Sequence, residues 1–114
     1  MKPDKSLLSG STTLLILALL SGGDMYGYEM IAQLEARSDR TFTLKEGTLY
    51  PILHGLEKEK YLTSYQQEAP SGRMRKYYRL TRRGRQLLDD KKKEWEAFRQ
   101  GVGDVLSGGA DALA

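Results

Sequence analysis

Residues Tyr61 to Leu80 read YLTSYQQEAPSGRMRKYYRL and differ in pattern from everything before them. Polar and apolar side chains alternate on both sides of APSG, whose Pro and Gly are typical of a turn. The stretch therefore predicts a β-hairpin with strands at 61–68 and 73–80 and the turn at Ser71-Gly72.

Alternation along the second strand sorts its side chains onto two faces. One face carries Met74, Tyr78 and Leu80, together with Lys76. The other carries Arg73, Arg75, Tyr77 and Arg79. We expect the first face to pack on the protein and the second to present a row of cations, with Tyr77 supporting the arginines.

Two helices are predicted near the N-terminus. The apolar run LLILALL, residues 14–20, indicates a helix that starts near Ser6, is buried on most sides and stops at Gly22-Gly23. A second helix follows, because its apolar residues recur at i, i+3, i+4 and i+7: Gly27, Met30, Ile31 and Leu34. We expect Gly27 to let another backbone approach closely.

A third helix is predicted before the hairpin, with Leu49, Ile52, Leu53 and Leu56 on its apolar face. Pro51 leaves two starts open. With Thr48 as the N-cap, the proline lies in the tolerated first turn. A start nearer Lys45 or Glu46 puts the proline inside the helix and predicts a kink.

After the hairpin, Thr81 can cap a last helix that runs towards Gln100, where Gly101 and Gly103 weaken it. Leu88, Trp95 and Val102 recur every seven residues along it, with Phe98 between them. Lys91 interrupts this seam, so the coiled-coil pattern is imperfect. The tail SGGADALA is expected to be mobile.

Charge is concentrated in one part of the chain. Residues 73–93 hold ten Lys or Arg and two Asp, a net of +8, although the whole chain carries only +3. The remainder therefore carries a net of −5. Such asymmetry favours a nucleic acid or an anionic surface as partner over a small substrate.

Composition argues against an enzyme or a metalloprotein. The 114 residues suffice for one modest domain, and 39% hydrophobic with 29% charged residues describe a soluble globular chain. The chain has no Cys, a single His (His54) and no glycine-rich phosphate loop with its lysine. We expect no cofactor, no metal, no membrane partner and a cytoplasmic location.

The N-terminus has a superficial likeness to a secretory signal, with Lys2 and Lys5 before LLILALL. Asp4 lies in the would-be basic region, and residues 9–13 interrupt the apolar segment. The run is also far shorter than the ~20 residues of a membrane span. A buried helix is the preferred interpretation.

The predicted order gives a mainly α fold with a small β-hairpin: a winged helix-turn-helix with a three-helix core. In this arrangement the third helix enters the major groove and the hairpin reaches the adjacent backbone or minor groove. Expected boundaries are 1–80 for the DNA-binding domain, 81–106 for a C-terminal dimerisation helix and 107–114 for a flexible tail.

Three motifs resemble the PadR family of bacterial transcriptional regulators: MYGYEM, GTLYPILHGLEKEKYL and GRMRKYYRLTRRG, followed by a helix with a Trp. The likeness spans about residues 12–98 and points to the small subgroup, which has a single C-terminal helix. The resemblance implies a homodimeric repressor of a pseudo-palindromic operator in double-stranded DNA. It further implies release by a small planar aromatic or phenolic ligand near the dimer interface.

Candidate residues follow from the pattern and the resemblance together. DNA contacts are predicted for Tyr26, Lys45, Thr48, Tyr50, His54, Arg73, Arg75 and Lys76. The dimer interface is predicted at Leu88, Trp95, Phe98 and Val102. A ligand site is predicted at Trp95, Phe98, Leu15 and Arg99.

Each set has a plainer explanation. Tyr26 and Tyr50 can be packing aromatics, His54 a surface residue, Trp95 a dimer-core aromatic, and the wing cations protection of an edge strand. A second hypothesis is a winged-helix module that binds effectors or proteins without DNA, since a fold alone does not settle function.

Overall fold

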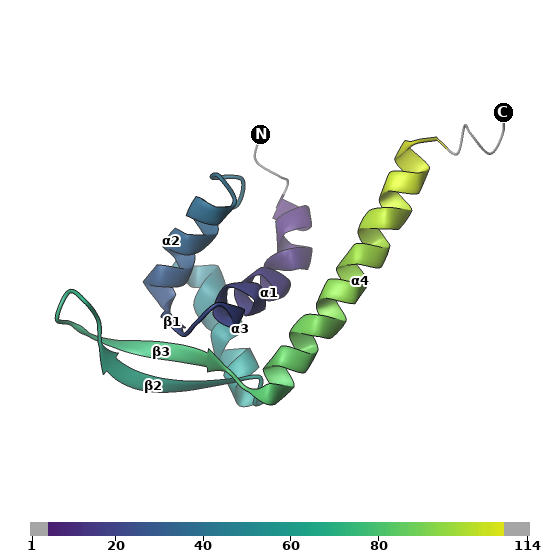
Figure 1. The fold of residues 1–114 in the computed structure, drawn as a ribbon. Coiled ribbons are helices and arrows are strands. Elements are labelled where there is room, and N and C mark those ends of the chain that lie inside the picture. The colour runs from purple at the N-terminus through teal and green to yellow at the C-terminus, as the bar shows by residue number, and fades with distance from the viewer. Residues whose placement is uncertain (1–4, 109–114) are drawn as a thin grey trace.

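The computed structural model describes residues 5–108, with side chains described from residue 10 onward. Within that range the chain forms four helices and a three-stranded antiparallel sheet (Figure 1). In chain order the elements are α1 (Lys5–Ser21), β1 (Met25–Tyr26), α2 (Gly27–Arg37), α3 (Glu46–Lys58), β2 (Leu62–Glu68), β3 (Met74–Leu80) and α4 (Arg82–Leu106). The predicted winged helix-turn-helix with a long last helix is confirmed.

Helix α1 lies at the centre and contacts α2, α4 and β3. Its side chains Ile16, Leu17 and Leu20 are at most 1% exposed, which confirms the prediction of a largely buried helix. The helix ends at Ser21, directly before the glycine pair. Within the described residues, no helix combines the length and apolar character needed to cross a membrane.

Helices α2 and α3 bury the predicted apolar faces. Met30 and Leu34 of α2 and Leu49, Leu53 and Leu56 of α3 are all buried. These side chains join those of α1 in one core.

Helix α3 begins at Glu46, with Lys45 as the N-cap. The Lys45 carbonyl accepts from the amides of Thr48 (3.0 Å) and Leu49 (2.9 Å), which settles the alternative start against Thr48 as the N-cap. Pro51 therefore lies inside the helix and donates no helical hydrogen bond. Its side of the helix is exposed, so water can solvate the freed carbonyl.

Strand β3 occupies the middle of the sheet, between β1 and β2. The short strand β1 was not predicted, because two residues carry no period; it pairs Met25 with Tyr78 and Tyr26 with Tyr77. Side chains cover both faces of β3 at its middle: Tyr77 is 8% exposed between the rings of neighbouring strands, and Tyr78 is 1% exposed in the core. The prediction of one packed and one open face is wrong here.

Strands β2 and β3 with their connecting turn form the wing, which projects beyond the helices (Figure 1). The predicted turn is confirmed: the Ala69 amide donates to the Arg73 carbonyl, and Gly72 has a φ of 88°, which favours glycine. Met74 was expected to pack with Tyr78, but it is 62% exposed because it lies at the turn end, beyond the helical body.

Helix α4 is joined firmly to the end of α3. The Thr81 hydroxyl accepts from the Gly84 amide (3.0 Å), as predicted for an N-cap, and donates to the Lys60 carbonyl (2.7 Å). Arg83 donates to the Glu59 carbonyl (3.1 Å). This anchoring fixes the direction in which α4 leaves the body.

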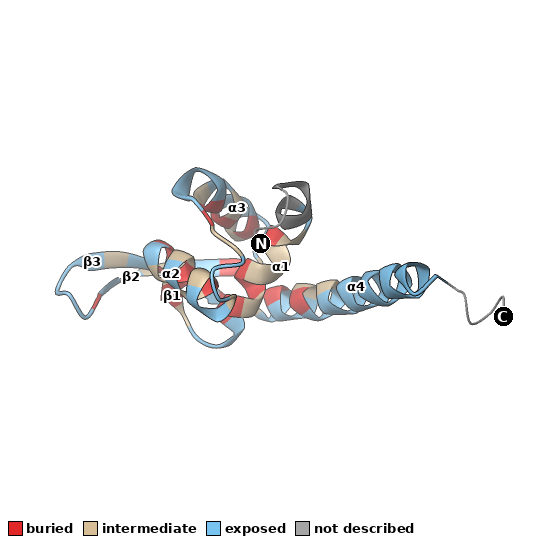
Figure 2. Cartoon of the chain, turned by 90° about the horizontal axis from the view of Figure 1, so that it is seen from above, coloured by how far each residue is buried: buried red, intermediate tan, exposed pale blue. Residues whose placement is uncertain are grey.

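Helix α4 continues through Gly101 and Gly103 to Leu106, and most of it is exposed (Figure 2). Ser107 and Gly108 form a turn. The rest of the predicted mobile tail lies outside the described residues, as do Lys2 and Asp4 at the other end.

Candidate nucleic-acid interface

Helix α3 presents a polar face opposite its buried leucines. Thr48 and His54 are exposed on it, and Lys45 is exposed at its start. Three of the residues predicted to contact DNA therefore lie along one accessible side of α3. Gly47 and Gly55 share this side and have no other group within 4 Å of where a Cβ would lie, so the helix surface there is bare.

Tyr50 is less exposed than Thr48 and His54. Its ring lies against Gly27 at the start of α2, where an added Cβ would be 2.3 Å from the Tyr50 hydroxyl oxygen. Gly27 thus admits a side chain, not the second backbone that we expected. Burial raises the pKa of Tyr50, in keeping with a packing role that spaces α2 from α3.

Tyr26 belongs to a row of three aromatic rings across the sheet. Because Tyr26, Tyr77 and Tyr65 are paired directly, their rings share one face. Tyr77 meets Tyr26 edge-on at 5.3 Å and stacks on Tyr65 at 5.7 Å between ring centroids. Tyr26 is half-buried in this row, and the two flanking rings explain why Tyr77 is buried.

The wing cations are not one continuous row. Arg73 is exposed at the turn end. Arg75 is half-buried, with its guanidinium 5.3 Å from the ring centroids of both Tyr26 and Tyr28. Tyr26 and Tyr28, rather than Tyr77, therefore support this arginine. The Arg75 Nε is buried and has no hydrogen-bond partner among the described residues.

Lys76 lies on the opposite face and points to the third helix. Its Nζ is 3.4 Å from Oε1 of Glu57 on α3. The Ser64 hydroxyl donates to the other oxygen of the same carboxylate. The hydrogen bond from Ser64, together with the charge of Lys76, lowers the pKa of Glu57. Lys76 is thus paired within the chain, whereas the Arg73 side chain has no ion-pair partner in the part of the chain that the structure describes.

Arg79 is engaged in the same way on the outer face. Its guanidinium is 2.9 Å from Oδ2 of Asp24, and the Tyr65 hydroxyl donates to that oxygen at 2.6 Å. Asp24 and Glu57 were not among the residues predicted from the sequence. No local pattern marks either residue, because their partners on β3 are 55 and 19 positions away in sequence.

The residues predicted for the dimer interface differ in exposure. Trp95, Phe98 and Val102 are 43%, 66% and 39% exposed on α4. Leu88 is 3% exposed and packs in the core of its own chain, so it has little surface to offer a partner.

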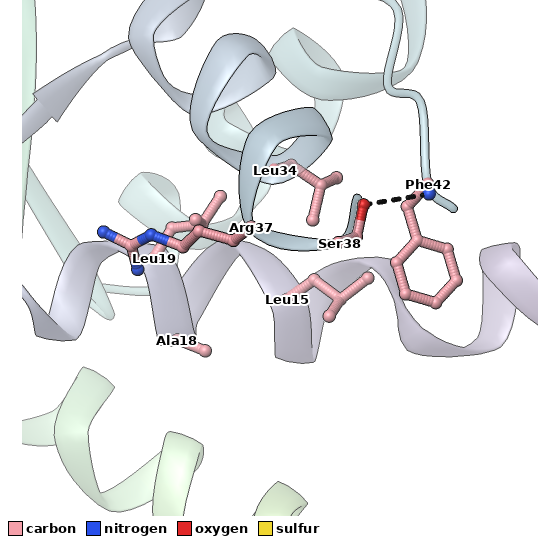
Figure 3. Close-up of a pocket in the computed structure, with 7 residues that line it drawn as sticks. All are labelled: Leu15, Ala18, Leu19, Leu34, Arg37, Ser38 and Phe42. Atoms are coloured by element: carbon pink, nitrogen blue, oxygen red, sulfur yellow. Dashed lines mark hydrogen bonds between the residues drawn. The ribbon is translucent and has the colours of Figure 1, made fainter. Parts of the chain in front are cut away.

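Of the residues predicted for the ligand site, Trp95, Phe98 and Arg99 lie close together on α4, because they are three and four positions apart, whereas Leu15 belongs to α1. Leu15 lines a cavity of about 280 Å³ between α1, α2 and the connection after α2, and its other lining residues are Ala18, Leu19, Leu34, Arg37, Ser38 and Phe42 (Figure 3). Trp95 and Phe98 are exposed on α4 and do not line it. Arg99 pairs with Glu96 on its own helix. Among the described residues, no three His, Asp or Glu side chains are grouped so that they could hold a metal ion.

Several known proteins resemble this chain in fold and in sequence. The model of the transcriptional regulator PadR-like family matches residues 16–90. The crystal structure of a PadR-like transcriptional regulator from Bacillus cereus superposes with a TM-score of 0.81 at 32% identity, covering 91% of this chain and 99% of the other. A PadR family regulator from Clostridium difficile gives 0.72 at 38% identity, covering 85% and 99%.

The transcriptional regulator YqjI of Escherichia coli is 29% identical over 82% of this chain and 43% of its own length, so the chain spans less than half of that relative. An uncharacterised protein of Lysinibacillus sphaericus is 32% identical over 90% and 94% of the two chains. The relatives from Bacillus cereus, Clostridium difficile and Escherichia coli are transcriptional regulators, which are not enzymes. The chain belongs to the PadR-like family of transcriptional regulators.

Proposed function

We propose that the chain binds double-stranded DNA with the exposed face of α3 and with the wing. The observation that carries this proposal is the accessible polar side of α3, with Lys45, Thr48 and His54, beside a wing that ends in the exposed cation Arg73. A helix of this kind fits the major groove, and a cationic ribbon fits the neighbouring phosphates.

The two parts have different tasks. Arg73 and Arg75 are proposed to neutralise phosphates, which supplies affinity without reading sequence. Thr48 and His54 are proposed to contact base edges, because both carry hydrogen-bonding groups on the accessible face. Lys76, Tyr26 and Tyr50 support the interface from within the fold, since each has a partner in the chain.

A homodimer is proposed from the exposed side of α4. Trp95 and Val102 are seven residues apart and Phe98 lies between them, so all three fall on one stripe of the helix. An exposed apolar stripe on a helix that projects from the body marks an interaction surface, and a second copy of α4 can bury it. The two-fold axis of such a dimer relates two copies of α3 and of the wing, which then match the two half-sites of a pseudo-palindromic operator.

Release by a small planar aromatic compound is proposed as the regulatory input. Paired Trp95 side chains can form the walls of a flat site at the two-fold axis, because planar rings stack well on an indole. Arg99 lies one helical turn from Trp95 on the same helix, and Leu15 of α1 is proposed to join this site in the dimer. The proposed role is repression of transcription in the cytoplasm.

An electrophoretic shift with the DNA upstream of the protein's own gene tests the DNA-binding function. We expect a complex at physiological salt that survives excess unrelated DNA. Its absence would favour the alternative, a winged-helix module that binds proteins or effectors without DNA.

Fluorescence tests the ligand, because Trp95 is the only tryptophan of the chain. We expect some planar aromatic compounds to quench or shift its emission and to release the DNA at the same concentration. A flat response over a broad panel would leave Trp95 with a purely structural role.

A further inference from the structure

Two carboxylates of the helical body meet the wing, one on each of its faces. Glu57 comes from α3, and Asp24 comes from the connection between α1 and β1. Glu57 reaches Ser64 and Lys76, whereas Asp24 reaches Tyr65 and Arg79. Ser64 and Tyr65 are consecutive residues of β2, so they point to opposite faces of the wing.

Each carboxylate joins both strands. It accepts a hydrogen bond from a hydroxyl on β2 and another from a cationic side chain on β3. Neither strand can therefore slide or tilt without breaking a contact. Asp24 is well placed for this role, because its side chain is only 24% exposed and one oxygen, Oδ2, receives both donors. Glu57 accepts from Ser64 with Oε2 and from Lys76 with Oε1.

Beyond its base, which also pairs with β1 and packs on the core, the wing has little support. Residues 66–68 and 70–74 are all exposed, and the wing projects from the body on the side opposite to α4 (Figure 2). A two-stranded ribbon is marginally stable and twists easily when nothing covers it. The contacts at its base therefore govern the direction of its tip.

We propose that Glu57 and Asp24 are positioning residues that hold the wing at a fixed angle to α3. The groove-facing helix and the phosphate-binding tip then meet DNA as one rigid unit. This inference rests on the proposed DNA-binding function for its consequence, but the rigidity itself can be measured on the free protein.

The first experiment measures the wing angle without DNA. The chain has no Cys, so Gln67→Cys on the wing and Ala36→Cys on α2 introduce two spin labels at exposed positions. Labelled chains are diluted with unlabelled ones, so that only distances within a chain contribute. We expect a narrow distance distribution that broadens with Glu57→Gln and with Asp24→Asn; distributions as narrow as that of the parent would overturn the proposal.

The second experiment uses the sign of the effect on DNA affinity. Removal of a negative charge near DNA ordinarily strengthens binding, and we expect that result for the control Glu59→Gln, whose exposed side chain follows α3 directly. Glu57→Gln and Asp24→Asn should instead weaken binding by about 3- to 10-fold, because only a fraction of the wings then has the competent angle. Binding that is unchanged or stronger would contradict the fixed-unit role.

A charge exchange separates the ion pair from general damage to the fold. Glu57→Lys and Lys76→Glu should each broaden the distance distribution, and the double variant should narrow it again. Failure of the double variant to recover, with circular dichroism like that of the parent, would count against the pair. If the parent protein forms no specific DNA complex, the proposed function fails while the distance measurement still decides the anchoring.

Discussion

The joint between α3 and α4 makes Gly84→Ala a severe substitution. A Cβ at Gly84 would lie 2.1 Å from the Tyr61 carbonyl oxygen and 3.0 Å from Cδ2 of Leu80. The carbonyl would have to retreat by about 1 Å to reach an ordinary carbon–oxygen contact of ~3.3 Å. That oxygen accepts from the Thr81 amide at 3.1 Å, so the retreat strains the start of α4 as well.

The magnitude follows from three opposing effects. Overpacking costs about 1–3 kcal/mol, and weakening the hydrogen bond to Tyr61 costs about 1 kcal/mol. The better helix propensity of alanine returns about 1 kcal/mol. We therefore expect Gly84→Ala to lower the free energy of unfolding by roughly 1–3 kcal/mol.

Urea unfolding followed by circular dichroism measures this change, at one fixed protein concentration because dimerisation would contribute to stability. Gly103→Ala is the matched control in the same helix, since nothing lies within 4 Å of its Cβ position and it is off the apolar stripe. The control should be neutral or stabilised by up to about 1 kcal/mol. Equal effects of the two substitutions would refute the close approach at Gly84.

Three further outcomes are expected. Lys60→Gly should raise the free energy of unfolding by about 0.5 kcal/mol in the same urea assay, because Lys60 has a φ of 66° that glycine adopts without strain; a loss of stability would contradict this. Phe98→Glu should turn a dimer into a monomer in sedimentation at equal concentration, since Phe98 is 66% exposed on the apolar stripe; a persisting dimer would move the interface elsewhere. The hydrogen bond from Ser64 and the charge of Lys76 lower the pKa of Glu57 in the folded protein. The Glu57 carboxylate therefore contributes fully to the free energy of unfolding above its unfolded pKa of about 4.3, and this contribution disappears as the pH falls through the lower folded pKa. The difference in free energy of unfolding between the parent and Glu57→Gln should therefore shrink in acid. A difference that grows in acid would contradict the lowered pKa.

Local periodicity was enough to predict the helices and the hairpin. The leucines of α3 repeat at helical spacing, and the wing alternates around a Pro-Gly turn. The start of α3 was left open, because Pro51 suits the first turn and Thr48 is a good N-cap by type. Packing of Leu49 and the hydrogen bonds to the Lys45 carbonyl favour the earlier start.

The candidate site was harder to predict, because its decisive contacts join distant residues. Strand β1 has two residues, yet its pairing buries Tyr77 and converts a predicted cationic face into an aromatic one. Lys76 and Arg79 look like free cations in the sequence, but Glu57 and Asp24 engage them across the fold. Arg73 has no such partner among the described residues, so it is the residue for which we most clearly propose a phosphate contact.

The salt dependence of DNA binding tests the central proposal most directly. The logarithm of the affinity should fall linearly with the logarithm of the salt concentration, with a slope of about 0.9 for each phosphate contact. Arg73→Ala should reduce the slope by about 2, because a dimer places two wings on the DNA. The control Lys93→Ala, an exposed cation on α4 far along the chain from the wing, should leave it unchanged. An Arg73→Ala slope equal to that of the parent would remove the wing from the DNA interface.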